Sequence, residues 1–161
     1  FGQSDLPCLR VSALNRLTQR LLQRYNVWDK VVAMRCQQYQ RLSVWENSAR
    51  ALHFEASQIG ESYLGYFVEN RILQLALIDT IEEEHADNVN VVYGTATSIN
   101  EAEASVKLDN YIHPQANMLN VADGVNAQLR HQANMRIPGW HYDTRASVLV
   151  VKSQYEFQRT T

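Results

Sequence analysis

The sequence predicts a mixed α/β fold, and three observations support this prediction. Stretches with apolar residues at helical spacing are interleaved along the chain with stretches of period two. Hydrophobic residues make up 45% of the 161 residues and charged residues 20%, which is typical of a globular protein. A chain of this length can bury a sizeable core, so we expect residues 1–161 to form a single compact piece.

The first third of the chain predicts two helices followed by a β-hairpin. Ser12 is a good N-cap for a helix over residues 13–25, and a second, shorter helix follows over residues 27–35. Alternating apolar and polar residues at 40–46 and 50–56 predict two antiparallel strands. The apolar face of the first helix would hold Leu14, Leu17, Leu21, Leu22 and Tyr25.

The rest of the chain predicts a long helix, several strands and a short helix. Gly60 and Gly65 indicate turn points in a loop, and a helix is expected over residues 69–84. Further strands are expected at residues 89–94, 104–109, 116–122 and 146–152. Between the last two of these strands, an Asp-Gly turn opens a short helix that would end near Asn134.

Charge and cysteine content exclude some classes of function. A net charge of −2 without a Lys/Arg block gives no basis for nucleic-acid binding. Arg16, Arg20 and Arg24 are spaced four apart; a solvated stripe is the preferred interpretation, and contact with an anionic surface is the alternative. Cys8 and Cys36 are expected to be free thiols, because two cysteines do not form a secreted disulfide framework.

The sequence shows no local motif for metal binding or nucleophilic catalysis. The five histidines lie far apart, and there is no G-x-S-x-G elbow, P-loop or G-x-G-x-x-G fingerprint. This pattern favours a protein in which a bound cofactor carries the chemistry. Asp123-Gly124 could be an ordinary turn before a helix, or a turn that approaches a phosphate group.

Five stretches of the sequence together carry a family resemblance. They are LRVSALN (9–15), VWDKVVAMRCQQYQRLSVWE (27–46), LGYFVENRILQLAL (64–77), ADGVNAQLR (122–130) and GWHYDTRASVLVVK (139–152). In this order they resemble the FAD-dependent aromatic hydroxylase family, in its ubiquinone-biosynthesis branch. The resemblance covers nearly the whole chain, and the combination is more specific than any one stretch.

The resemblance implies the central fragment of a two-domain FAD-dependent hydroxylase. A β-sheet substrate domain with helices would be interleaved with part of a Rossmann-like FAD domain. Residues 9–35 and 69–134 would be mainly FAD-domain-like, and residues 36–68 and 135–161 mainly substrate-domain sheet. The chain begins without Met and ends after a strand-like run, so we expect a piece of a longer enzyme that is inactive and does not hold FAD stoichiometrically by itself.

The resemblance also implies an activity. NAD(P)H would reduce the bound FAD, and the reduced flavin would activate O₂ to hydroxylate a polyprenylated benzoquinol in ubiquinone biosynthesis, without a metal. A cytoplasmic location peripheral to the inner membrane and a partner complex of ubiquinone biosynthesis are expected. Two alternatives remain open: a non-catalytic binding or scaffold module of the same fold, and a flavin hydroxylase that acts on a small soluble phenol.

Five positions match residues that contact the cofactor in this family, whereas no catalytic residue is assigned. Arg10 matches the arginine of the R-V-S-A segment, which approaches FAD, and Asn70 matches a cofactor-contacting position. Asp123 and Gly124 match the Asp-Gly fingerprint associated with the pyrophosphates of FAD and NAD(P)H, and Arg130 matches its terminal arginine.

Two positions depart from that fingerprint. Val121 replaces its first glycine, and Ala127 replaces its serine. Valine does not supply the positive φ that glycine adopts, and alanine has no hydroxyl to cap a helix or bind a phosphate. Cofactor contact at this turn would therefore depend on Asp123 and Gly124.

Overall fold

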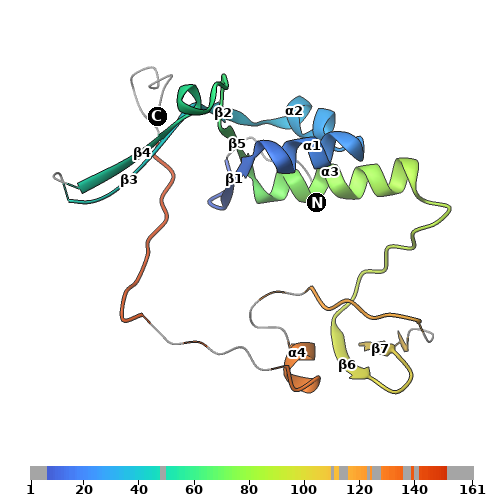
Figure 1. The fold of residues 1–161 in the computed structure, drawn as a ribbon. Helices are drawn as coiled ribbons and strands as arrows, with labels where there is room; N and C mark the ends of the chain where they lie inside the picture. The colour runs from blue at the N-terminus through green and yellow to red at the C-terminus, as the bar shows by residue number, and fades with distance from the viewer. Residues whose placement is uncertain are drawn as a thin grey trace. The chain divides into compact units, whose positions relative to one another are not determined.

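The protein is described here by a computed structural model, which covers residues 7–47, 50–109, 111–112, 116–122, 124, 128–135, 139 and 142–151. Its contacts group into two compact units where the length predicted one piece: Phe1–Val89 with Ala146–Thr161 form unit 1, and Asn90–Arg145 form unit 2. Both units contain helices as well as strands, so the mixed α/β class is confirmed (Figure 1). Each unit is described by itself.

Unit 1 contains three α-helices, a three-stranded sheet and a two-stranded ribbon among its described residues. Its elements are β1 (Val11–Asn15), α1 (Arg16–Arg24), α2 (Trp28–Met34), β2 (Gln37–Tyr39), β3 (Arg41–Asn47), β4 (Arg50–Glu55), the 3₁₀ helix η1 (Ala56–Ile59), β5 (Gly65–Glu69) and α3 (Asn70–Glu84). The predicted helix over 69–84 is confirmed as α3, and that over 27–35 as α2.

The three-stranded sheet has the antiparallel order β1-β5-β2, with β5 in the centre. Gly65 begins β5 and pairs with Asn15 on one side and Tyr39 on the other. The prediction of a turn at Gly65 is therefore wrong. Glycine is needed there for a different reason: a Cβ would lie 3.0 Å from the Tyr39 hydroxyl and closer still to the Leu14 carbonyl oxygen. Gly60 does form a turn, with φ +70 after η1.

Helix α1 begins later than predicted. Residues 11–15 pair with β5 as strand β1, so Ser12 lies in a strand instead of capping a helix. The cap is Asn15, whose side chain accepts a hydrogen bond from Thr18 N at 2.9 Å. The alternation of V-S-A-L-N fits a strand as well as a helix start, and the pairing with β5 decides between them.

The core of unit 1 lies between the helices and the sheet. The edge of the Trp28 ring packs on Tyr66 of β5, with ring centroids 4.9 Å apart. Helix α3 buries one face, on which Ile72, Ala76 and Thr80 recur every four residues. The buried cluster consists of Leu22, Val27, Trp28, Val31, Val68, Ile72 and Ala76.

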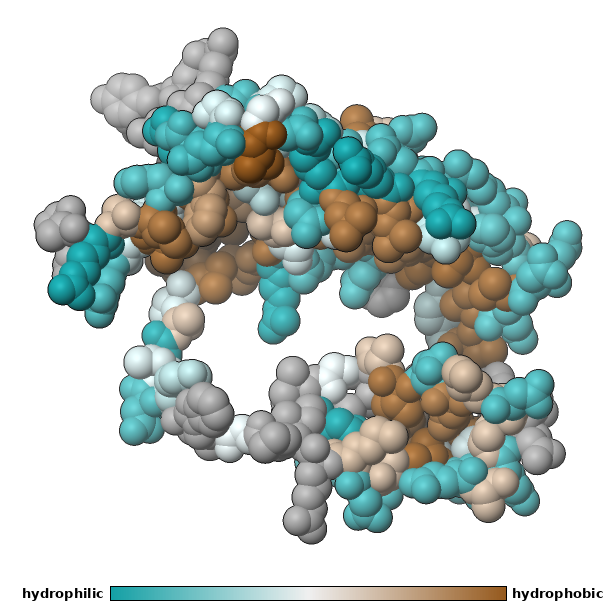
Figure 2. Space-filling model, in the orientation of Figure 1, coloured by the Kyte–Doolittle hydropathy of each residue, from teal (hydrophilic) through white to brown (hydrophobic). Residues whose placement is uncertain are grey.

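Strands β3 and β4 form the predicted antiparallel hairpin, as a separate two-stranded ribbon. Its register places Leu42 opposite Phe54 and Val44 opposite Leu52. These four side chains share one face, because side chains two apart point to the same side of a strand. All four are exposed, and Figure 2 shows hydrophobic surface along this ribbon.

Unit 2 contains a small antiparallel sheet and one short helix among its described residues. The sheet has the order β6-β7-β8, from β6 (Ala96–Asn100), β7 (Ser105–Leu108) and β8 (Tyr111–Ile112), and the helix is α4 (Gln128–Gln132). The strand predicted over 104–109 is confirmed as β7. Its partner β6 was not predicted, because Ala-Thr-Ser-Ile-Asn has little apolar alternation.

Three predicted strands are wrong in the parts that the structure describes. Residues 89–94, 116–122 and 146–151 are without strand assignment, although each is rich in apolar or β-branched side chains. A strand needs a pairing partner as well as a favourable sequence, and none of these three segments pairs with another strand among the described residues. Val148, Leu149, Val150 and Val151 are left exposed.

Candidate functional site

Two of the five predicted cofactor contacts come together in unit 1. Arg10 and Asn70 are 60 residues apart, and the pairing of Val11 with Glu69 places them side by side. The Asn70 backbone N–H donates a hydrogen bond to the Arg10 carbonyl at 3.0 Å. The Ser12 hydroxyl donates to Asn70 Oδ1 at 2.6 Å, which fixes the amide. Their contact with a cofactor stays a prediction.

Arg10, Ser12 and Asn70 lie at the beginning of α3, where the negative charge of Glu69 is balanced by Arg35. The buried Glu69 precedes the helix, and its carboxylate accepts hydrogen bonds from Arg35 Nε at 2.6 Å and from Cys8 N at 2.7 Å. The first turn of α3 contains no acidic residue. Unpaired N–H groups at a helix start favour an anionic or polar acceptor, and the Glu69 charge is already matched by Arg35.

A cavity of about 270 Å³ borders this group. It is lined by Pro7, Val11, Arg35, Cys36, Gln37, Phe67 and Glu69. Burial raises the pKa of the Cys36 thiol, which keeps this side chain neutral and poorly nucleophilic at neutral pH. Both cysteines are free, as predicted.

The other three predicted contacts, Asp123, Gly124 and Arg130, belong to unit 2. Asp123 lies outside the described residues. Gly124 has φ +94, and a Cβ on it would meet no atom within 4 Å, so the turn is open on that side. Val121 has no positive φ, which means that the glycine of the family pattern is not required here. Ala127 also lies outside the described residues.

Arg130 lies on α4 and shares one feature with Arg16. Its Nε is buried and has no hydrogen-bond partner among the described residues. Asn134, with φ +51, and Met135 close the helix through hydrogen bonds to the carbonyls of His131 and Arg130. The helix therefore ends near Asn134, as predicted. A buried N–H without an acceptor costs free energy, which an anionic ligand atom would recover.

A second cavity, of about 570 Å³, borders the segment that leads to Gly124. Polar and apolar atoms contribute about equally to its lining, which comes from residues 90–92, from β7 with the preceding Ala104, and from residues 116–120. The lining residues are Asn90, Val92, Ala104, Val106, Leu108, Ala116, Leu119 and Asn120.

Each unit, taken by itself, offers donor groups for the acceptor atoms of a ligand. The guanidinium groups of Arg10 and Arg130, the fixed amide of Asn70 and the open backbone at Gly124 can all serve acceptor oxygens or ring heteroatoms. The described residues contain no group of three His, Cys, Asp or Glu side chains that could hold a metal ion.

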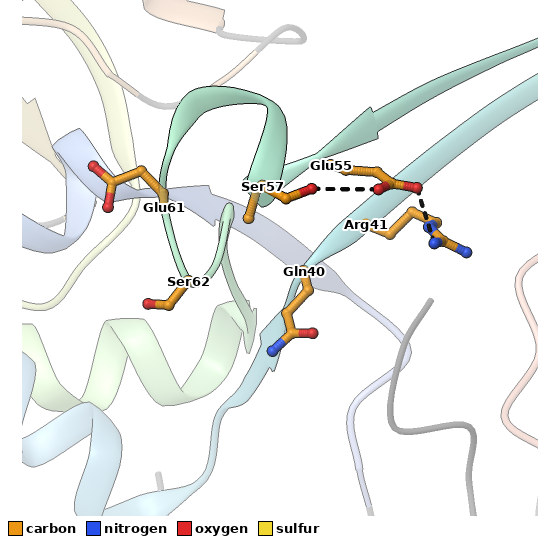
Figure 3. A pocket seen from close by; sticks show the side chains of 7 residues that line it. Gln40, Arg41, Glu55, Ser57, Glu61 and Ser62 are labelled. Carbon is orange, nitrogen blue, oxygen red and sulfur yellow. Dashed lines mark hydrogen bonds and ion pairs between the residues drawn. The ribbon is translucent and has the colours of Figure 1, made fainter.

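A third hollow, of about 240 Å³, lies where the ribbon meets η1 (Figure 3). In it, Glu55 accepts hydrogen bonds from Arg41 at 2.8 Å and from Ser57 at 3.4 Å, and Gln40 and Ser62 lie across from this pair. Glu55, Arg41 and Ser57 are bonded to one another, and the Glu61 carboxylate is paired with Arg16, so the charged groups of this hollow already have partners. Ser12, Arg35 and Glu69 were missed as site residues, because their roles depend on strand pairing.

The chain is similar to known hydroxylases over nearly all of its length. It is 32% identical to 3-demethoxyubiquinol 3-hydroxylase of Escherichia coli over 158 residues, which are 96% of this chain and 40% of that protein. It is 30% identical to the mitochondrial ubiquinone biosynthesis monooxygenase COQ6 of Rattus norvegicus, and 28% identical to that of Homo sapiens, in each case over 86% of this chain. These matches cover 31% and 32% of the two COQ6 proteins.

No family model matches the chain. Within the part of the chain that the structure describes, no helix has the length and apolar character needed to cross a membrane. The chain spans about two fifths of the length of the E. coli relative and about a third of the COQ6 proteins. These similarities confirm the resemblance seen in the sequence: the chain resembles the hydroxylases of the ubiquinone-biosynthesis branch.

Proposed function

We propose that this chain is the central part of an FAD-dependent monooxygenase that hydroxylates a polyprenylated benzoquinol in ubiquinone biosynthesis, with NAD(P)H as the electron donor. The observation that carries this proposal is the match of 96% of the chain to a ubiquinol-precursor hydroxylase. The meeting of Arg10 and Asn70 at the start of α3 supports it, because the predicted contacts become neighbours in space.

We propose that Arg10 and Asn70 in unit 1, and Asp123, Gly124 and Arg130 in unit 2, hold FAD. Bound FAD, once reduced, supplies the activation of O₂ that hydroxylation of an aromatic ring requires. The protein's part is to bind and orient the cofactor. Ser12 positions Asn70, since its hydroxyl occupies Oδ1 and thereby directs the amide nitrogen elsewhere. The buried Nε of Arg130 offers a donor without an acceptor among the described residues.

The substrate sheet is proposed to be built on the β3–β4 ribbon, and the apolar run at residues 146–151 is proposed to cover the exposed face of this ribbon. A two-stranded ribbon is marginally stable, and three or more strands with a packed apolar face are needed for stability. The ribbon exposes Leu42, Val44, Leu52 and Phe54, and the run Val148–Val151 is apolar and exposed in the same unit. An apolar sheet face is also suited to a prenylated ring.

The test uses the protein encoded by the complete reading frame. It should purify with about one equivalent of FAD and should restore ubiquinone in an E. coli strain lacking 3-demethoxyubiquinol 3-hydroxylase, with loss of the accumulated precursor by mass spectrometry. Asn70→Ala should weaken FAD binding, measured as quenching of flavin fluorescence. Asn88→Ala, at an exposed position outside the predicted site, is the matched control.

Arg130→Met provides a readout that does not depend on activity. It removes a buried donor without a partner, so the unliganded protein should be as stable as the wild type or more stable, while its affinity for FAD falls. A protein without flavin would indicate the non-catalytic module. A flavoprotein that oxidises soluble phenols but leaves the quinol precursor unchanged would indicate the alternative substrate.

A further inference from the structure

Helix α1 presents an apolar stripe to solvent. Leu17, Leu21 and Tyr25, at its end, are spaced four apart and therefore lie on one side of the helix. Their exposed fractions are 73%, 52% and 53%, whereas Gln19 and Leu22 are buried. The sequence predicted one apolar face that holds Leu14, Leu17, Leu21, Leu22 and Tyr25. In the structure Leu22 is buried and Leu14 packs against the core, whereas Leu17, Leu21 and Tyr25 are exposed. Figure 2 shows hydrophobic patches interrupting the polar surface over the helices of this unit.

The opposite side of α1 is held to the rest of unit 1 by polar contacts. The Tyr63 hydroxyl donates a hydrogen bond to Gln19 Oε1 at 3.0 Å. Arg16 forms an ion pair with Glu61, and its guanidinium lies 5.1 Å from the centre of the Tyr63 ring. These contacts fix the rotation of the helix, so the stripe cannot turn inward without breaking them.

Two arginines lie along one edge of the stripe. Arg20 and Arg24 are exposed, and neither has an ion-pair partner among the described residues. Each follows a stripe residue by three positions, Leu17 and Leu21 respectively, which places both along one edge of the stripe. The predicted three-arginine stripe is thus reduced to two available cations, because Arg16 is paired.

Three carboxylates of the neighbouring elements have partners of their own, whereas Asp29, Asp79 and Glu82 have no ion-pair partner among the described residues. Glu61 pairs with Arg16, and Glu83 of α3 pairs with Lys30 of α2. Glu84 accepts a hydrogen bond from Asn26 Nδ2 at 2.8 Å, beyond the last turn of α1. Glu84 keeps its negative charge, but the exposed charged side chains on α1 itself, Arg20 and Arg24, are both positive. Apolar surface next to positive charge complements the boundary of an anionic lipid leaflet.

We propose that α1 docks this protein on an anionic lipid surface. Leu17, Leu21 and Tyr25 would enter the boundary between headgroups and acyl chains, and Arg20 and Arg24 would bind lipid phosphates. A second copy of the chain is a poorer occupant, because a two-fold contact through this face would bring the same pair of arginines against each other. The proposal does not depend on the hydroxylase activity.

The experiment is co-sedimentation of the intact protein with phosphatidylcholine vesicles that either contain or lack phosphatidylglycerol. Binding is expected to the anionic vesicles and to fall with added salt. R20Q and R24Q should each weaken it by about fivefold at low salt. L17S/L21S should abolish it, whereas I59S, which removes an equally exposed apolar side chain on η1, should leave it unchanged.

All these side chains are exposed, so the variants should fold, which circular dichroism checks. Several results would overturn the proposal: no binding to anionic vesicles, equal binding to both kinds of vesicle, or equal loss with I59S. A dimer in light scattering that L17S/L21S dissociates, without vesicle binding, would overturn it in favour of self-association.

Discussion

Gly65 is the position at which a single methyl group should damage this fold most clearly. It begins the central strand β5 and is held between Asn15 of β1 and Tyr39 of β2. In Gly65→Ala, the new Cβ would lie 3.0 Å from the Leu14 carbonyl carbon, 3.0 Å from the Tyr39 hydroxyl and closer still to the Leu14 carbonyl oxygen. Two of these three atoms are backbone atoms of a paired strand.

The loss of stability in Gly65→Ala depends on which of these three atoms can move. The Tyr39 hydroxyl can shift, but moving the Leu14 carbonyl disturbs the ladder between β1 and β5. Inserting a methyl group into a packed site costs typically about 1–3 kcal/mol, and a clash with backbone belongs at the upper end. Replacing glycine by alanine returns about 0.4–1 kcal/mol by restricting the unfolded chain. We expect a net loss of about 2 kcal/mol in the free energy of unfolding of unit 1.

The assay is urea denaturation followed by circular dichroism and tryptophan fluorescence, since Trp28 lies in the core of this unit. Gly60→Ala is the matched control. Its Cβ would meet nothing within 4 Å, so its cost of about 1 kcal/mol comes from the positive φ of +70 alone. If Gly65→Ala proves as stable as the wild type, or more stable than Gly60→Ala, the close approach of β1 and β5 described above is incorrect.

Three further predictions concern other parts of the chain. Glu69→Gln should lower the free energy of unfolding in the urea titration by about 2 kcal/mol, because the buried carboxylate accepts hydrogen bonds from both Arg35 and the Cys8 N–H. In the same titration the control Glu83→Gln, at the exposed pair with Lys30, should change the free energy of unfolding by less than about 0.5 kcal/mol. Ala104→Gly should stabilise unit 2 by up to about 1 kcal/mol in thermal unfolding, since Ala104 has φ +46 in the β6–β7 turn; a loss of stability would contradict this. Burial raises the pKa of the Cys36 thiol, so its alkylation by iodoacetamide, followed by peptide mass spectrometry, should reach half-maximal rate at a higher pH than in the urea-unfolded chain. The unfolded thiol ionises first, so stability should also fall as pH rises past the pKa of the unfolded thiol.

Local patterns in the sequence were sufficient for elements whose partners lie nearby. The hairpin of β3 and β4 and the helices α2 and α3 follow from alternation and helical spacing over adjacent residues. Strand β1 could not be predicted in this way, because its partner β5 lies about fifty residues further along the chain. The same long-range pairing explains why Gly65 was assigned to a turn and why β2 was missed.

In the candidate site, too, the sequence indicated single residues, whereas their contacts depend on long-range pairing. Family resemblance indicated Arg10 and Asn70 separately, but their contact arises from the pairing of Val11 with Glu69. Ser12 was assigned to a helix cap, although its hydroxyl holds the Asn70 amide. The buried Nε of Arg130 depends on how α4 packs on β6, which no local pattern reports.

Helix α1 marks a limit of periodicity as evidence. A four-residue repeat of apolar side chains shows that a helix has two different sides, but it does not show which side faces the protein. In α1 the answer comes from the polar side, where Gln19 and Arg16 contact Tyr63 and Glu61. A part-buried hydrogen bond, an ion pair and the buried Leu22 hold the helix by that side, and the apolar stripe is left exposed. Vesicle binding therefore tests whether the exposed side of α1, with Leu17 and Leu21, is a lipid-contacting surface.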